Sequence, residues 1–184
     1  MPTTLVERLA EARIGSTFNF YAEGPRAPLL RARLTAYLAE RADAPLLLVA
    51  EAPGWRGTRV SGIPLTSERL LTGTGPAEAT ATIVHRVLAE LGLQERVLLW
   101  NVVPTHPHRP RSPESNRPPT CAEVEASRPF LGTLARGRRV LPVGRLAQAA
   151  LGGRYVRHPS HGGADAFRAG LMEYVRGDGR RRAL

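Results

Sequence analysis

Apolar residues along the chain follow two patterns, helical spacing and short unbroken runs. Five of them share one face of a helix predicted over residues 26–41: Leu29, Leu30, Leu34, Tyr37 and Leu38. Residues 46–50 then form an unbroken apolar run, which is typical of a strand buried on both faces of a parallel sheet. The same succession recurs twice, as a helix over 77–91 before a strand within 96–103, and a helix over 120–135 before a strand over 139–143. Such alternation predicts an α/β fold.

Weaker signals complete the predicted order of elements. Helical spacing predicts three further helices, over residues 2–13, 144–151 and 164–175, and Tyr155–Val156 predicts a short fourth strand. Thr120 is a candidate N-cap, with Glu123 three residues later as its capping-box partner. Two segments are predicted as long loops, 51–76 and 104–119, and residues 177–184 as a frayed basic tail. The whole chain, 1–184, is thus predicted to be one three-layer α/β/α domain around a central, mainly parallel, four-stranded sheet.

Composition narrows the classes of partner and cofactor. The chain has 184 residues, a net charge of +10 and no lysine, so every basic side chain except histidine is arginine. Such charge favours a polyanion as partner, nucleic acid first, although GC-rich codon usage explains the absence of lysine equally well. A single cysteine, Cys121, excludes a disulfide framework within the chain and a four-cysteine iron–sulfur cluster. The longest apolar run is too short to span a membrane, and the first residues lack a secretory pattern, so we expect a cytoplasmic protein.

Candidate catalytic side chains follow the ends of the predicted strands. Glu51 comes directly after the first strand, Asn101 follows Trp100 at the end of the second, and His158 follows the fourth. In open α/β sheets, ligands bind at the carboxyl ends of the strands. A carboxylate, an amide and an imidazole are therefore expected to converge on one crevice, although each residue alone is equally compatible with a cap or a loop contact.

The ordered set of motifs resembles the uracil-DNA glycosylase superfamily, and is nearest to its family-4 enzymes. Leu48 to Gly54, followed by Gly62-Ile63-Pro64-Leu65, is similar to the first motif and its downstream segment. Four later segments are similar to further motifs in the same order: Trp100-Asn101-Val102-Val103, Arg128-Pro129-Phe130-Leu131, Val143-Gly144-Arg145-Leu146-Ala147 and His158-Pro159-Ser160. The resemblance extends over roughly residues 18–175.

The resemblance implies roles for individual residues. Glu51 would orient water and stabilise positive charge on the sugar, and His158 would donate a hydrogen bond to the departing base. Asn101 would read the base edge, because its amide offers both a donor and an acceptor. Other base contacts are expected from Pro53, Gly54, Leu65 and Phe20, the last as a substitute for a stacking aromatic residue. Contacts with DNA are expected from six residues: Ser160, Arg56, Arg109, Arg111, Arg117 and His161.

Several positions depart from the family pattern. Ala52 stands where the family-1 enzymes carry an aspartate, Leu65 replaces the usual stacking phenylalanine, and Gly54 stands where the family-1 enzymes exclude thymine with a tyrosine. Thr105 and Ser127 occupy two cysteine positions of the family-4 cluster, so we expect no iron–sulfur cluster, no metal and no other cofactor. The segment after Ser160 lacks an apolar wedge, which predicts weak penetration of duplex DNA or a wedge supplied elsewhere.

The hypothesis from the sequence is a monomeric, monofunctional uracil-DNA glycosylase acting on single- or double-stranded DNA. It would flip the nucleotide out and hydrolyse the glycosidic bond with water, since no lysine amine is present as a nucleophile. Three alternatives remain open: a non-catalytic nucleic-acid-binding module of the same fold, a glycosylase for hypoxanthine or xanthine, and a lyase using the amine of Pro2. A zinc deaminase is disfavoured because its paired cysteines are missing.

Overall fold

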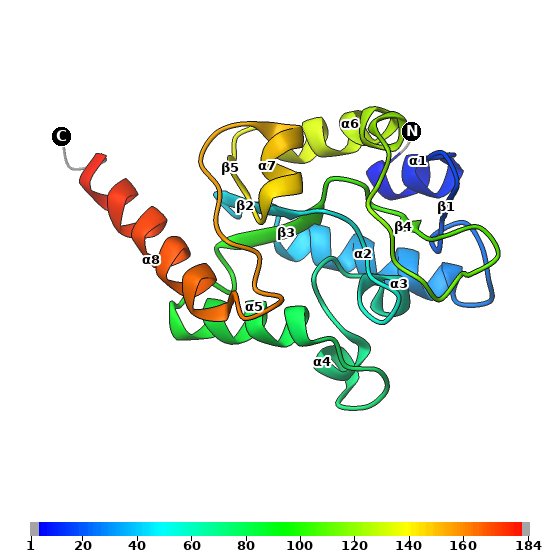
Figure 1. The fold of residues 1–184 in the computed structure, drawn as a ribbon, viewed down its shortest axis with the longest axis horizontal. Helices are drawn as coiled ribbons and strands as arrows, with labels where there is room; N and C mark the ends of the chain where they lie inside the picture. The colour runs from blue at the N-terminus through cyan, green and yellow to red at the C-terminus, as the bar shows by residue number, and fades with distance from the viewer. Residues whose placement is uncertain (1–3, 182–184) are drawn as a thin grey trace.

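The computed structural model describes residues 4–181, with the side chains of 178–181 excepted, so Pro2 and the last residues of the expected tail lie outside it. Strands and helices follow one another in the order α1 (Leu5–Glu11), β1 (Thr17–Phe18), α2 (Ala27–Glu40), β2 (Leu46–Ala50), α3 (Thr58–Ser61), α4 (Glu68–Thr72), α5 (Ala79–Glu90), β3 (Val97–Asn101), β4 (His106–Pro107), α6 (Cys121–Ala135), β5 (Arg139–Pro142), α7 (Arg145–Leu151) and α8 (Ala164–Arg181). Figure 1 shows the strands through the middle of the molecule, with α6 and α7 above them and α5 and α8 below.

The central sheet is parallel and has the strand order β3-β2-β5. In its register Leu46 lies opposite Val97 on one side and Arg139 on the other, and Ala50 lies opposite Asn101. All five residues of β2 and all five of β3 are buried, as the unbroken apolar runs predict. The paired register brings the carboxyl ends of β2 and β3 to one edge of the sheet.

The three-layer α/β/α prediction is confirmed, but the count of four strands is not. The expected fourth strand at Tyr155–Val156 contributes only one parallel bridge, between Val156 and Val143. Two backbone hydrogen bonds hold this bridge, Gly144 N–H to the Val156 carbonyl at 2.8 Å and Val156 N–H to the Pro142 carbonyl at 3.0 Å. This short attachment is sufficient to place the segment that follows, which carries His158, beside the ends of the longer strands.

Further differences from the predicted order occur where periodicity is absent. β1 and β4 form an antiparallel two-stranded ladder in which Thr17 pairs with Pro107 and Phe18 with His106. The segment 51–76, predicted as loop, contains the short helices α3 and α4. α8 continues to Arg181, beyond the predicted end at residue 175 and into the expected tail, and its distal half extends away from the body in Figure 1. Within the described part of the chain, no helix has the length and apolar character needed to cross a membrane.

The predicted capping box at the start of α6 is present. Thr120 Oγ1 accepts a hydrogen bond from Glu123 N–H at 3.2 Å, and the Glu123 carboxylate accepts one from Thr120 N–H at 2.9 Å. Glu123 is only 2% exposed, and its carboxylate also accepts hydrogen bonds from Arg117 at 2.6 and 2.8 Å and from Ser16 N–H at 3.3 Å. A Cβ at Gly15 would come within 2.6 Å of the Glu123 side chain, so glycine leaves room for this cluster.

Candidate active site

A cavity of about 180 Å³ opens at the carboxyl ends of β2 and β3. Its walls include the three side chains predicted to converge, Glu51, Asn101 and His158. Thirteen residues line it: Ala50, Glu51, Ala52, Pro53, Gly54, Thr58, Leu65, Glu78, Thr80, Asn101, Asn116, Arg117 and His158. Its volume lies below the roughly 300–1,000 Å³ of pockets for drug-sized ligands, so it suits one small planar group. We call it the inner cavity.

Asn101, one of the residues that line the inner cavity, carries a buried polar atom without a partner. The residue is only 2% exposed, and its Oδ1 has no hydrogen-bond partner within the part of the chain that the structure describes. Leaving a buried carbonyl unsatisfied costs about 1–3 kcal/mol, so native proteins rarely do so without a reason. A ligand that donates a hydrogen bond to Oδ1 would remove this cost. Because Asn101 also lines the inner cavity, its unsatisfied oxygen favours a ligand there that carries an N–H or O–H donor.

Glu51 lies at the point where β2 gives way to the loop that follows it. Backbone hydrogen bonds fix this point, from Val102 N–H to the Ala50 carbonyl at 2.8 Å and from Val103 N–H to the Glu51 carbonyl at 3.1 Å. The side chain is half-buried, and burial raises the pKa of its carboxyl above the ordinary glutamate range. A desolvated carboxylate is a stronger proton acceptor than one in water. Glu51 is thus suited to act as a general base on a water molecule.

The hydrogen bonds of His158 fix its tautomer. Ser160 N–H lies 3.2 Å from His158 Nδ1, and because a backbone amide only donates, Nδ1 accepts and the ring proton resides on Nε2. Ser160 Oγ, 2.8 Å from the same nitrogen, completes the contact. Burial lowers the pKa of His158, and the neighbouring charges of Arg157 and His161 lower it further. The ring is therefore neutral at pH 7, with Nε2–H available as a donor.

Two glycines allow His158 to occupy this position. Gly144 has a φ of +89°, and a Cβ there would lie 3.1 Å from the Cβ of His158. A Cβ at Gly163 would lie 2.1 Å from the His158 carbonyl oxygen, a distance that real structures do not show. The bend that carries His158 therefore depends on glycine at both positions.

Among the other predicted base contacts, Pro53, Gly54 and Leu65 line the inner cavity and Phe20 does not. Leu65 is buried and has a φ of +53°, a strained value for a leucine, with its N–H held by Thr58 Oγ1 at 3.1 Å. Phe20 is 1% exposed and packs in the core against Tyr21, with ring centroids 4.4 Å apart. The structure thus presents no aromatic ring of Phe20 to a ligand in the inner cavity.

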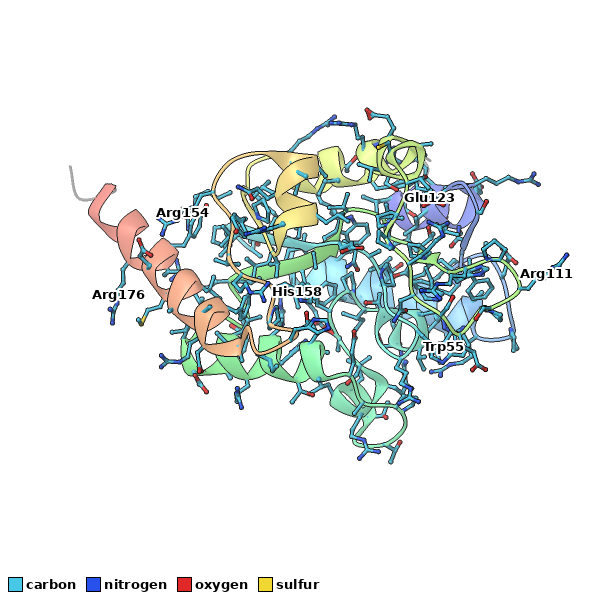
Figure 2. All side chains as sticks on the ribbon, viewed as in Figure 1. Trp55, Arg111, Glu123, Arg154, His158 and Arg176 are labelled. Carbon is cyan, nitrogen blue, oxygen red and sulfur yellow. The ribbon has the colours of Figure 1, made fainter. Side chains whose placement is uncertain are left out.

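The residues predicted to contact DNA differ in their exposure to solvent and in whether their charge is already paired within the protein. Arg111 is exposed at the tip of the loop between β4 and α6, where Figure 2 shows it pointing away from the body, and Arg109 is exposed beside it. Ser160 and His161 lie next to His158, with Ser160 Oγ 3.0 Å from His161 Nδ1. Arg117, in contrast, is held in an ion pair with Glu123 at 2.6 Å, which also raises the pKa of its guanidinium. Its charge is already paired within the protein.

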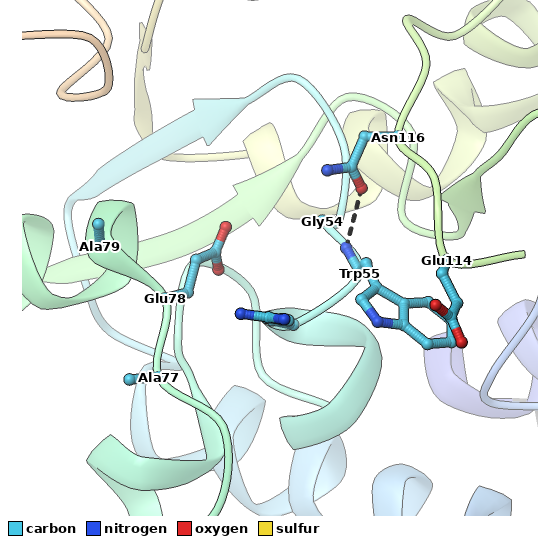
Figure 3. A pocket seen from close by; sticks show the side chains of 8 residues that line it. Gly54, Trp55, Ala77, Glu78, Ala79, Glu114 and Asn116 are labelled. Carbon is cyan, nitrogen blue, oxygen red and sulfur yellow. Dashed lines mark hydrogen bonds between the residues drawn. The ribbon is translucent and has the colours of Figure 1, made fainter.

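A second cavity of about 430 Å³, here called the outer cavity, adjoins the inner one. Arg56, which was predicted to contact DNA, is one of its lining residues. Figure 3 shows its lining, in which Asn116 Oδ1 accepts a hydrogen bond from Trp55 N–H at 3.0 Å. Gly54, Glu78 and Asn116 line both cavities. Sequence reasoning identified neither Glu78 nor Asn116. Glu78 falls within the helix predicted over residues 77–91, whereas α5 begins at Ala79 and leaves Glu78 as its N-cap residue.

Residues at the positions expected for cluster cysteines make hydrogen bonds instead. Thr105 Oγ1 lies 2.5 Å from Thr17 Oγ1, and Ser127 Oγ donates to the Glu123 carbonyl at 2.7 Å. Cys121 is exposed. Across residues 4–181, no group of three His, Cys, Asp or Glu side chains is close enough together to hold a metal ion.

The fold and the site together define a class, that of α/β enzymes with a small polar cavity at the carboxyl ends of parallel strands. A sequence model of the Uracil DNA glycosylase superfamily matches residues 38–175, well over half of the chain, and the protein belongs to this superfamily. It is thus a DNA glycosylase, of the kind that acts in base excision repair.

Comparison with solved structures supports the same fold. The crystal structure of wild-type SMUG2 from Pedobacter heparinus is similar over 100% of both chains, with a TM-score of 0.67 at 14% sequence identity. At that identity the likeness concerns the fold alone. A search of curated proteins gave no significant match.

Proposed function

We propose that the protein is a monofunctional glycosylase that hydrolyses uracil from DNA. The observation that carries the proposal is the buried, unpartnered Oδ1 of Asn101 in the same cavity as Glu51 and His158. Uracil offers an N3–H donor beside its O4 acceptor, and the two faces of one asparagine amide match this pair. The target nucleotide must leave the helical stack to reach the cavity, at a cost of a few kcal/mol in a duplex.

The chemistry follows from the two titratable groups. As the glycosidic bond breaks, positive charge grows on the sugar and negative charge on the base. Glu51, as a carboxylate, would take a proton from the attacking water and stabilise the sugar cation. The neutral His158 would donate from Nε2 to O2 of the departing base. The bond from the sugar carbon to N1 breaks, a bond from that carbon to the water oxygen forms, and the abasic strand stays intact.

Two alternatives rest on specific observations. Leu65 in place of an aromatic residue and Ala52 after Glu51 favour a nucleic-acid-binding module without catalysis, since the first removes a ring that would stack on the base and the second a carboxylate that would act on the water or the sugar. A polar rather than aromatic lining also favours a glycosylase for another deaminated base, such as hypoxanthine or xanthine.

We further propose that the protein acts as a monomer in the cytoplasm, where the exposed arginines contact DNA phosphates.

The test is base release from labelled oligonucleotides that contain uracil, hypoxanthine or xanthine, single- or double-stranded, at two salt concentrations. We expect the wild type to release uracil fastest, and His158→Ala to lower the single-turnover rate about 10²- to 10³-fold through loss of one charge-stabilising donor. Binding without release of any base would establish the binding module instead. Release of a purine base ahead of uracil would overturn the substrate assignment and keep the enzyme.

A further inference from the structure

Glu78 lies at the boundary between the two cavities, although it comes from a different part of the chain than the other acidic wall residue. It immediately precedes α5, whereas Glu51 follows β2. With Gly54 and Asn116, Glu78 is one of three residues that line both the inner and the outer cavity. Glu78 therefore belongs to the wall that the two cavities share.

Two glycines fix the position of the Glu78 carboxyl. A Cβ at Gly57 would lie 1.8 Å from Glu78 Oε2, and a Cβ at Gly54 would lie 3.2 Å from Oε1. Figure 3 shows the side chain projecting from beside Ala79 toward Gly54. The carboxyl group therefore occupies the space that side chains at 54 and 57 would fill. In this way the wall of the inner cavity next to Gly54 is formed by a side chain from the start of α5.

The carboxyl group of Glu78 has no partner among the described residues. Its backbone carbonyl accepts from Thr82 N–H at 3.0 Å and from Thr82 Oγ1 at 3.1 Å, but no described residue donates to its side chain. Burial raises the pKa of this carboxyl above the ordinary glutamate range. The group occupies the same volume whether or not it carries a proton, so its effect on the shape of the cavity does not depend on pH.

The edges of a bound pyrimidine indicate what Glu78 would face. On the proposed function, on which this inference rests, His158 takes the O2 edge and Asn101 takes the N3–H and O4 edge. The edge that remains is the one formed by C5 and C6, and the remaining acidic wall is that of Glu78. We propose that Glu78 is the specificity-determining residue that excludes bases with a substituent at C5, thymine above all, from the inner cavity.

The physical basis is both steric and electrostatic. The C5 hydrogen of uracil fits against the carboxyl group, whereas the methyl group of thymine would need the space that the carboxyl fills. That carboxyl cannot retreat toward Gly54 and Gly57, because it already packs against both. Burying a methyl group against a carboxylate would also strip water from the charge without supplying a hydrogen bond.

Three variants test the proposal with single-stranded oligonucleotides that contain uracil, thymine or hypoxanthine. We expect Glu78→Ala to raise the ratio of kcat/KM for thymine over uracil roughly 10- to 100-fold, the usual scale for one methyl group in a pocket. Glu78→Gln keeps the shape and is expected to keep the wild-type ratio within about threefold. Glu114→Ala is the matched control, since Glu114 lines the outer cavity alone.

A binding experiment separates this proposal from the proposed function. Oligonucleotides with 2′-fluoro-deoxyuridine or 2′-fluorothymidine resist cleavage, and their affinities are measured by fluorescence anisotropy for the same proteins. Preference for the uracil probe in the wild type and its loss in Glu78→Ala support exclusion of thymine by Glu78 even if no base is released. Base release by the wild type with an unchanged ratio in Glu78→Ala overturns the role proposed for Glu78 and leaves the proposed glycosylase function in place.

Other outcomes also decide the matter. A gain for hypoxanthine without any gain for thymine would overturn the assignment of the C5 edge. Equal affinity of the wild type for both fluorinated probes would likewise overturn the proposal. Thermal unfolding of each variant shows whether it is folded, and Glu78→Thr provides a second truncation if the alanine variant unfolds.

Discussion

Glu51 and Glu123 both have carboxyl groups that are at least partly buried, but they differ in their hydrogen-bond partners. This difference distinguishes a residue of the candidate site from a residue that stabilises the fold. The Glu123 carboxylate accepts hydrogen bonds from Arg117, Thr120 N–H and Ser16 N–H, and the bonds from Arg117 are the main cause of its lowered pKa. No residue between 4 and 181 is seen to donate a hydrogen bond to the side chain of Glu51, and burial raises its pKa. A carboxylate with satisfied oxygens stabilises the fold, whereas one without partners costs stability and is available to a substrate.

Glu51→Gln gives the largest effect expected from this contrast. The amide keeps the shape but cannot take a proton from water, so the single-turnover rate of base release should fall about 10²- to 10⁴-fold. Because a partly buried, unpartnered charge is removed, the midpoint of thermal unfolding should stay constant or rise. A variant that lost stability and kept its rate would show that Glu51 belongs to the scaffold.

Glu123→Ala should show the opposite profile. Removal of the carboxylate leaves Arg117 without its partner and the backbone N–H groups of Ser16 and Thr120 without an acceptor, at a cost of about 2–4 kcal/mol in the free energy of unfolding. Urea denaturation measures this cost. The rate per folded molecule should change by less than about threefold below the unfolding transition, and a loss of rate with unchanged stability would contradict the comparison.

The pH dependence of the two carboxylates provides a finer distinction. The proposed mechanism needs Glu51 ionised and His158 neutral. Since burial raises the pKa of Glu51 and lowers that of His158, the acidic limb of Glu51 should lie above about pH 4.3 and that of His158 below about pH 6.5. Glu51→Gln should lose one limb in the profile of kcat against pH.

Stability should respond at lower pH than activity does. The folded pKa of Glu123 is depressed, so its contribution is complete above the unfolded value of about 4.3 and is lost as pH falls through the folded value. The difference in unfolding free energy between the wild type and Glu123→Gln should therefore be constant near neutrality and shrink below about pH 4. Coincident loss of activity and stability on acidification would contradict the separation.

Long periodic segments could be predicted from the sequence because local pattern determines them. β2 was predicted and found at residues 46–50, and the Thr120–Glu123 capping box needs only four consecutive residues. The ladder of β1 and β4 could not be predicted, because two-residue strands have no period and their pairing depends on contacts some ninety residues apart. α3 and α4 were missed for the same reason, since a helix of four or five residues is stabilised by tertiary packing rather than by its own pattern.

The site was predictable where strand ends determine position. Glu51 and Asn101 line the inner cavity because parallel strands align their carboxyl ends, and His158 follows from its motif. Glu78 and the burial of Phe20 were not predictable. The first depends on two glycines more than twenty residues upstream, and the second on how two adjacent aromatic rings share the core.

The contact between Ser16 and Glu123 also has a consequence for folding kinetics. It joins residues 107 positions apart, so a long loop must close before it forms. Contacts of such separation are expected to form late, after the βα units have assembled from more local pairings. The hydrogen bonds of Glu123 with Ser16, Arg117 and Thr120 should therefore mainly slow unfolding. Their removal would shorten the lifetime of the native state and leave the rate of folding nearly unchanged.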